Sequence, residues 1–68
     1  MEYTTKHNTS ERTMTHDFGN GHELIVDFNF GRIIKVYNNE IKDSFPIGDM
    51  TLSEYERILV NFHKAIIK

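Results

Sequence analysis

Four histidines, His7, His16, His22 and His63, are the side chains in this sequence best suited to chemistry near neutral pH. Imidazole is a common metal ligand and proton carrier in that range. In the hairpin register derived below, His16 and His22 lie on one face, close enough to share a metal ion. A stable zinc site usually needs three or four protein ligands, and no thiolate or obvious carboxylate converges on this pair. The sequence therefore predicts no metal and no cofactor.

The carboxylates, serines and glycines also lack the arrangement that catalysis requires. General acid–base catalysis needs two carboxylates that converge in a cleft, whereas Asp17, Glu23 and Asp27 lie on strands with mixed facing. Ser44 and Ser53 have no recognisable base or nucleophile elbow around them. The glycines have the spacing of turns and not of a dinucleotide-binding motif. We therefore expect a protein that is not an enzyme.

Nucleic-acid binding is the alternative function that the sequence leaves open. Tyr37, with Arg32, Lys35 and Lys42 near it, could form a surface on which unpaired bases stack. The formal net charge of −2 argues against broad electrostatic binding, and no ribonucleoprotein-like motif is present. Nucleic acid is therefore the less favoured partner.

Length and composition indicate one small globular domain. The chain has 68 residues, of which 38% are hydrophobic and 26% charged, so it can bury one thin core. It contains no cysteine, which fits a reducing compartment. No apolar run approaches the roughly 20 residues that span a bilayer, and the first residues do not resemble a signal peptide. These features predict a cytoplasmic protein without a membrane partner.

The alternation of apolar residues predicts the first hairpin. Residues 1–10 are polar and read as a mobile N-terminal arm or a peripheral edge segment, ahead of a single domain over residues 11–68. Two strands with a period of two follow, from residue 12 to 18 and from 22 to 30, around Gly19-Asn20-Gly21. A three-residue loop keeps the apolar side chains together, whereas a two-residue Asn20-Gly21 turn would place Asp17 opposite Leu24. We prefer the first, which pairs Phe18 with His22, His16 with Leu24, and Met14 with Val26.

A third strand, Arg32–Tyr37, is expected after a three-residue connection centred on Gly31. This register pairs Phe28 with Ile34 and Val26 with Val36 on the inner face, and Asp27 with Lys35 and Ile25 with Tyr37 on the outer face. Asn38-Asn39 is a plausible tight turn into a shorter strand, Glu40–Phe45. Burial of Ile41 and Phe45 there would turn Asp43 inward, so we expect a bulge, an edge position or an early end near Pro46.

The C-terminal segment carries the signals of a helix. Thr51 and Glu54 have the spacing of a capping box, and Met50 and Tyr55 that of a hydrophobic staple. An apolar stripe with helical period should cover the inner face of the sheet, and its members are Leu52, Tyr55, Ile58, Leu59, Phe62, Ala65 and Ile66. The fold class is therefore α+β: a small antiparallel β-meander of three to four strands, packed on one face by a single C-terminal α-helix.

Apolar residues at positions expected to face water suggest association surfaces. Ile25, Ile33 and Tyr37 fall on the expected outer sheet face, while Val60 and Ile67 lie off the helix stripe. The candidate partner-binding residues are Ile25, Ile33, Lys35, Tyr37, Glu56, Val60, His63 and Ile67. The same pattern would also arise if the N-terminal arm folds over the sheet, or if the register is wrong. We expect a binding partner that is another protein, a second copy of the chain, or both.

The small, cysteine-free, single-domain plan resembles that of many phage-encoded accessory proteins that inhibit a host enzyme or defence complex by occupying a surface. The resemblance is one of size and layout, and it transfers no functional residue. It implies an inhibitor or regulator, with antagonism of a bacterial defence as one form of that function.

Overall fold

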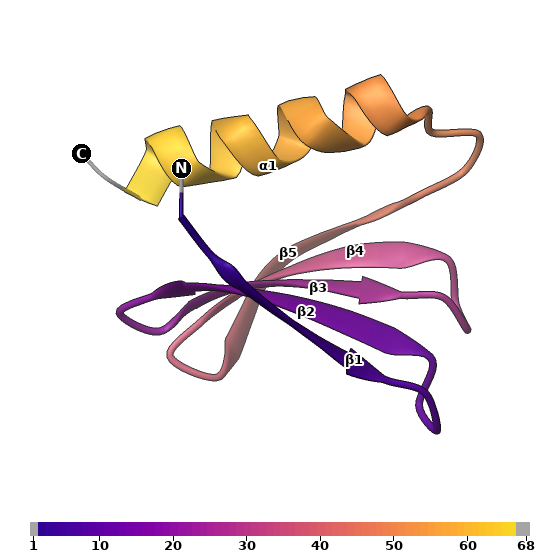
Figure 1. The fold of residues 1–68 in the computed structure, drawn as a ribbon, viewed down its shortest axis with the longest axis horizontal. Coiled ribbons are helices and arrows are strands. Elements are labelled where there is room, and N and C mark those ends of the chain that lie inside the picture. The colour runs from indigo at the N-terminus through magenta and orange to yellow at the C-terminus, as the bar shows by residue number, and fades with distance from the viewer. Residues whose placement is uncertain (1, 67–68) are drawn as a thin grey trace.

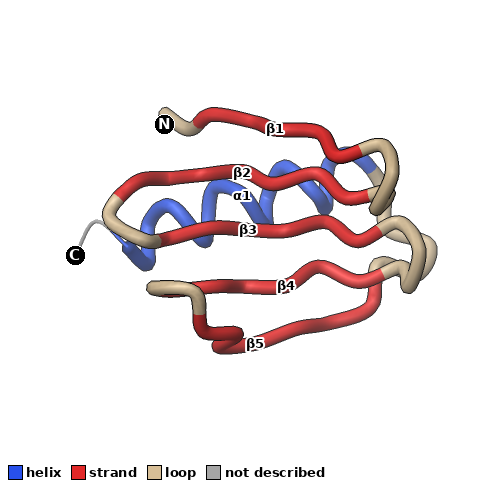
Figure 2. Tube along the Cα trace, turned by 90° about the horizontal axis from the view of Figure 1, so that it is seen from below, coloured by secondary structure: helices blue, strands red, loops and turns tan. Residues whose placement is uncertain are grey.

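The computed structural model describes residues 2–66 as five antiparallel strands in chain order followed by one helix (Figure 1). The elements are β1 (Thr4–Asn8), β2 (Thr13–Gly19), β3 (His22–Asp27), β4 (Arg32–Tyr37), β5 (Glu40–Pro46) and α1 (Leu52–Ile66). The helix lies across one face of the sheet and leaves the other face open (Figures 1 and 2). The α+β class is confirmed, with five strands instead of three or four because Thr4–Asn8 pair with β2.

The hairpin of β2 and β3 has the expected register over most of its length. Met14 pairs with Val26, and His16 pairs with Leu24. At the tip, however, the pairing shifts by a bulge after Asp17, so that Gly19 and not Phe18 faces His22. The Asp17 carboxylate accepts a hydrogen bond of 2.8 Å from the Gly19 amide within this bulge. The extra residue allows a two-residue turn at 20–21 without exchanging the buried and exposed faces.

The loop between β3 and β4 differs from the prediction and changes the facing of β4. It has four residues, 28–31, because β3 ends at Asp27, whose pairing partner is Arg32. Oδ1 of Asp27 accepts hydrogen bonds from the amides of Asn29 (2.9 Å) and Phe30 (3.2 Å). These bonds stop the strand and fold the chain locally, as Asp does in turns. The predicted three-residue connection is therefore wrong.

β5 is an edge strand with a bulge, as the sequence indicates. Asn38 and Asn39 form the turn before it, with φ of 50° and 66°. The register of β4 and β5 shifts between Lys35 and Val36. Ile41 then pairs with Val36 on the face away from the helix and is 69% exposed, so its expected burial is wrong.

The helix begins with the predicted capping box. The Glu54 amide donates to Oγ1 of Thr51 (3.2 Å), and the Thr51 amide donates to Oε1 of Glu54 (3.4 Å). Leu59 and Phe62 are the buried residues of the apolar stripe, whereas Leu52 at its start is 73% exposed. The core is one cluster between helix and sheet, formed by Leu24, Val26, Ile33, Leu59 and Phe62.

Candidate functional site

No other element covers the sheet face away from the helix (Figures 1 and 2). The strand pairing places a row of apolar side chains on this face. Ile25 of β3 pairs with Ile34 of β4, and Val36 of β4 pairs with Ile41 of β5. Ile25 and Ile34 are half-buried by their neighbours, Val36 is buried and Ile41 is exposed. We call Ile25, Ile34, Val36 and Ile41 the outer apolar row. Their side chains lie on one face because the pairing puts each beside its partner.

Only Ile25 of the predicted sheet residues lies on this outer face. Ile33 pairs with Val26 and is fully buried in the core, so its expected exposure is wrong. Lys35 and Tyr37 alternate with Val36 and therefore share the helix side of the sheet with Ile33. The cause is the four-residue loop, which pairs Val26 with Ile33 instead of Val36. This shift of three residues is an odd number, so it exchanges every side chain of β4 between the two faces.

The side chains expected to stack bases are consequently engaged elsewhere. The ring of Tyr37 stacks on His22 with centroids 4.5 Å apart. Nζ of Lys35 lies 5.7 Å from the ring centroid of Phe45. Lys42 forms an ion pair of 2.9 Å with Glu40. The structure does not bring Tyr37, Lys35 and Lys42 together on the open face.

The candidate residues on the helix do not form a continuous patch with those of the sheet. Glu56 is exposed, and Val60 is 39% exposed on the solvent side of the helix. His63 is half-buried, with its ring 6.3 Å from that of Phe18. Ile67 lies outside the described residues.

His16 is the buried polar residue of the core, and both of its ring nitrogens are hydrogen bonded. Nδ1 is 3.0 Å from Oγ1 of Thr5 on β1, and Nε2 contacts the hydroxyl of Tyr55 on α1. Burial lowers the pKa of His16, and electrostatic repulsion from the neighbouring His7 lowers it further. Burial also raises the pKa of Tyr55 to about 12, with a contribution from Tyr3. Both groups are therefore neutral near pH 7, and the network joins β1, β2 and α1.

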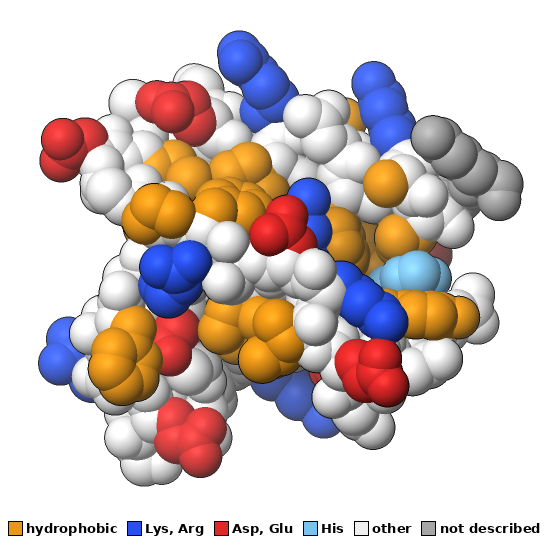
Figure 3. Space-filling model, turned by 180° about the vertical axis from the view of Figure 1, so that it is seen from behind, with side chains coloured by type: hydrophobic (Ala, Val, Ile, Leu, Met, Phe, Trp, Pro, Cys, Tyr) orange, Lys and Arg blue, Asp and Glu red, His pale blue; other side chains and the backbone are white. Residues whose placement is uncertain are grey.

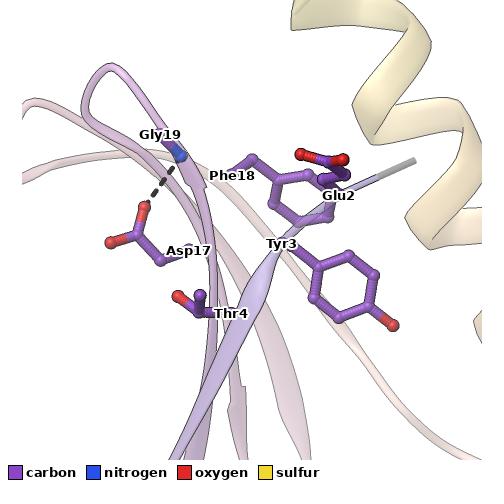
Figure 4. A pocket seen from close by; sticks show the side chains of 6 residues that line it. All are labelled: Glu2, Tyr3, Thr4, Asp17, Phe18 and Gly19. Atoms are coloured by element: carbon purple, nitrogen blue, oxygen red, sulfur yellow. Dashed lines mark hydrogen bonds between the residues drawn. The ribbon is translucent and has the colours of Figure 1, made fainter.

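Tyr55 is half-buried in this network, whereas the His16 imidazole is buried. Tyr3 covers it, with its ring centroid 5.0 Å from that of His16 and 5.0 Å from that of Phe18. Beside Tyr3 and Phe18 is an open hollow of about 680 Å³, lined also by Glu2, Thr4, Asp17 and Gly19. The two rings lie on its helix side, whereas Asp17 and Thr4 point the other way (Figure 4). His16 does not line the hollow, so a ligand there would not reach the imidazole.

A second hollow is an apolar groove at the opposite end of the helix, between the sheet and the β5–α1 connection. Its volume is about 310 Å³. Met14, Val26 and Ile33 form its sheet side, and Ile47, Met50 and Leu52 form its helix side. We call it the helix-start groove. Hydrophobic side chains are visible in the gap between helix and sheet from the β5 side (Figure 3).

Within residues 2–66, no group of three or more His, Cys, Asp or Glu side chains could hold a metal ion. In the same part of the chain, no helix is long and apolar enough to cross a membrane. No protein-family model, curated protein sequence or solved structure matches the chain.

Sequence reasoning missed Ile34, Val36 and Ile41 as outer residues and missed the helix-start groove. The signal that could have corrected the register is Asp27 followed two residues later by Asn29, since Asp commonly binds the amide two residues ahead. The groove has no comparable signal, because it is formed by residues from four separate segments.

Proposed function

We propose that this protein is a non-catalytic protein-binding module that inhibits or regulates a partner by covering part of the partner's surface. The observation that carries the proposal is the outer apolar row on an open sheet face. Ile41 is 69% exposed there beside Val36, and Ile25 and Ile34 are half-buried on the same face. Apolar groups gathered on one face are typical of interaction sites, whereas scattered single ones are not.

The remaining geometry favours binding over catalysis. His16 is buried under Tyr3 and lines neither hollow, whereas Tyr55 is half-buried and lines the helix-start groove. The argument for nucleic-acid binding required Tyr37 and Lys35 on the open sheet face, but both lie on the helix side of the sheet. We extend the proposal to steric inhibition of a host enzyme or defence complex, which is the activity that the size and layout of the chain suggest.

The test is affinity capture from cells of the native host, with recovered proteins identified by mass spectrometry. The variant Ile34→Ser/Ile41→Ser removes two members of the outer apolar row, and Ala65→Ser, at an exposed helix position outside the candidate residues, is the control. We expect one protein to be recovered by the wild type and by Ala65→Ser, and to be lost with the double variant. Equal recovery by the double variant, with unchanged circular dichroism, would reject the outer row as the binding surface.

A titration with single- and double-stranded oligonucleotides at two salt concentrations distinguishes a protein-binding module from a nucleic-acid-binding regulator. A protein-binding module should show no binding, whereas contacts to a phosphate backbone produce affinity that weakens as salt increases. Salt-dependent binding of either oligonucleotide would favour a nucleic-acid-binding regulator instead.

A further inference from the structure

We propose that the helix-start groove is a self-association site in which Phe30 of a second copy is seated. This site is separate from the outer apolar row, and the proposal goes beyond the proposed function. It starts from a protruding aromatic residue and an apolar groove that lie side by side on one molecule.

Phe30 is 79% exposed at the β3–β4 loop, and Phe28 in the same loop is 52% exposed. Hydrogen bonds of the loop fix the backbone at both residues. Asp27 accepts a hydrogen bond from the Phe30 amide, and the Phe28 amide donates to the carbonyl of Arg12 (2.9 Å). The side chain of Asn29 donates to the carbonyl of Glu11 (3.3 Å). A large apolar ring on an ordered loop loses little conformational entropy when it binds.

The groove begins where this loop ends. The Ile47 amide donates a hydrogen bond of 2.8 Å to the carbonyl of Gly31, which fastens the β5–α1 connection to the β3–β4 loop. Phe28 forms part of the groove wall. The groove volume of about 310 Å³ exceeds the roughly 150 Å³ of an apolar cavity that binds benzene, so a phenyl ring fits.

A protruding side chain beside a groove, as Phe30 lies beside the helix-start groove, makes a surface that is self-complementary under a two-fold rotation. In such an arrangement each Phe30 enters the groove of the other copy, and the contact closes at two copies. A different protein would need to supply its own apolar knob, whereas a second copy already carries one at the required place. This is the reason for choosing the second copy as the occupant.

The charges around the groove fit the same arrangement. Arg12 lies beside Phe28, and Asp49 lies in the β5–α1 connection between Ile47 and Met50, which line the groove. Arg32 and Glu54 are engaged within the molecule, with Ser44 and with Thr51. Side chains of both charge signs are visible on the face that shows the helix–sheet gap (Figure 3). Among residues 2–66, neither Arg12 nor Asp49 forms an ion pair. Glu11 and Asp27 also lie near the loop, but Oδ1 of Asp27 is occupied by the loop amides.

Sedimentation equilibrium from about 1 μM to about 1 mM tests this proposal. We expect the wild type to shift from one copy to two within this range, and Phe30→Ser to weaken the association at least about tenfold, as for an interface hot spot. Ile41→Ser, on the outer apolar row, is the matched control and should associate like the wild type. Because Phe30 is exposed, its replacement should leave the circular dichroism unchanged.

A second measurement follows the groove itself. The methyl signals of Met14 and Met50, which line it, should shift with protein concentration in the wild type and stay constant in Phe30→Ser. A single copy at every concentration would overturn the proposal and leave the groove to another occupant, such as an apolar side chain of a different protein. Association of Phe30→Ser as tight as the wild type would also overturn it. Both outcomes can be told apart from failure of the outer apolar row, which is removed by different substitutions.

Discussion

The hydroxyl of Tyr55 and Nε2 of His16 are hydrogen bonded across the interior, between residues 39 positions apart in the chain. With Thr5 at the other ring nitrogen, this bond links the first strand, the second strand and the helix through one imidazole. In a domain whose core is a single thin cluster, such a link contributes to how the helix is seated on the sheet.

We expect Tyr55→Phe to lower the free energy of unfolding by about 1–3 kcal/mol, because Nε2 of His16 would be left buried without a partner. Urea-induced unfolding followed by circular dichroism measures this loss. Tyr37→Phe is the control, since the Tyr37 ring is exposed and stacked on His22, and should change stability by less than about 0.5 kcal/mol. Equal effects of the two substitutions would contradict the role assigned to the bond.

Stability should also depend on pH through His16. Its pKa is lowered in the fold relative to the ordinary value of 6.5, so the unfolded chain takes up the proton first as pH falls. The contribution of His16 to the free energy of unfolding is therefore complete above pH 6.5 and decreases below it, until the lower pKa of the folded state is reached. Urea midpoints at about pH 7.5 and about pH 5.5 test this. The difference between the two urea midpoints should be smaller for His16→Gln than for the wild type. An unchanged difference would show that the pH dependence comes from other groups.

Asp27 marks the point at which the secondary structure predicted from the sequence departs from the observed fold. The capping box at Thr51, the asparagine turn and the pairing of His16 with Leu24 all follow from local chemistry or from alternation, and the structure has them. Alternation also continues through Phe28, and it predicts a strand where the Asp27 carboxylate instead binds two amides of a loop. A local side-chain bond of this kind competes with strand pairing, and hydrophobic periodicity does not report it.

The length of this one loop also decides the members of the candidate site. The observed pairing of β3 with β4 differs from the predicted one by three residues, which moves Ile33 into the core and places Ile34 and Val36 outside. The kind of surface is predictable from an excess of apolar residues, whereas its members depend on the register that the loop sets. The partner of His16 is not predictable at all, because Tyr55 is 39 residues away and meets it only through packing of the helix.

The hairpin tip provides a third prediction. Gly21 has a φ of 84°, and its carbonyl accepts a hydrogen bond of 2.9 Å from the backbone amide of Asn38. A Cβ at this position would collide with the Asn38 side chain. Gly21→Ala should therefore cost the roughly 1–2 kcal/mol of a left-handed conformation and a smaller amount for displacing the Asn38 side chain. Gly31→Ala is the matched control, with a φ of 62° and no atom within 4 Å of the added Cβ. Thermal or urea unfolding of the two variants should show the larger loss for Gly21; a larger loss for Gly31 would contradict the collision.

The start of the helix gives the last prediction. Oγ1 of Thr51 accepts from the Glu54 amide, and Oε1 of Glu54 accepts from the Thr51 amide, so the two side chains satisfy two backbone donors that the helix cannot. Thr51→Ala should lower the free energy of unfolding by about 0.5–2 kcal/mol. Ser53→Ala, an exposed position in the first turn, should have little effect and serves as the control. Because the Glu54 amide loses its acceptor in Thr51→Ala, its hydrogen exchange should accelerate. An unchanged exchange rate would show that the cap contributes little to holding this turn.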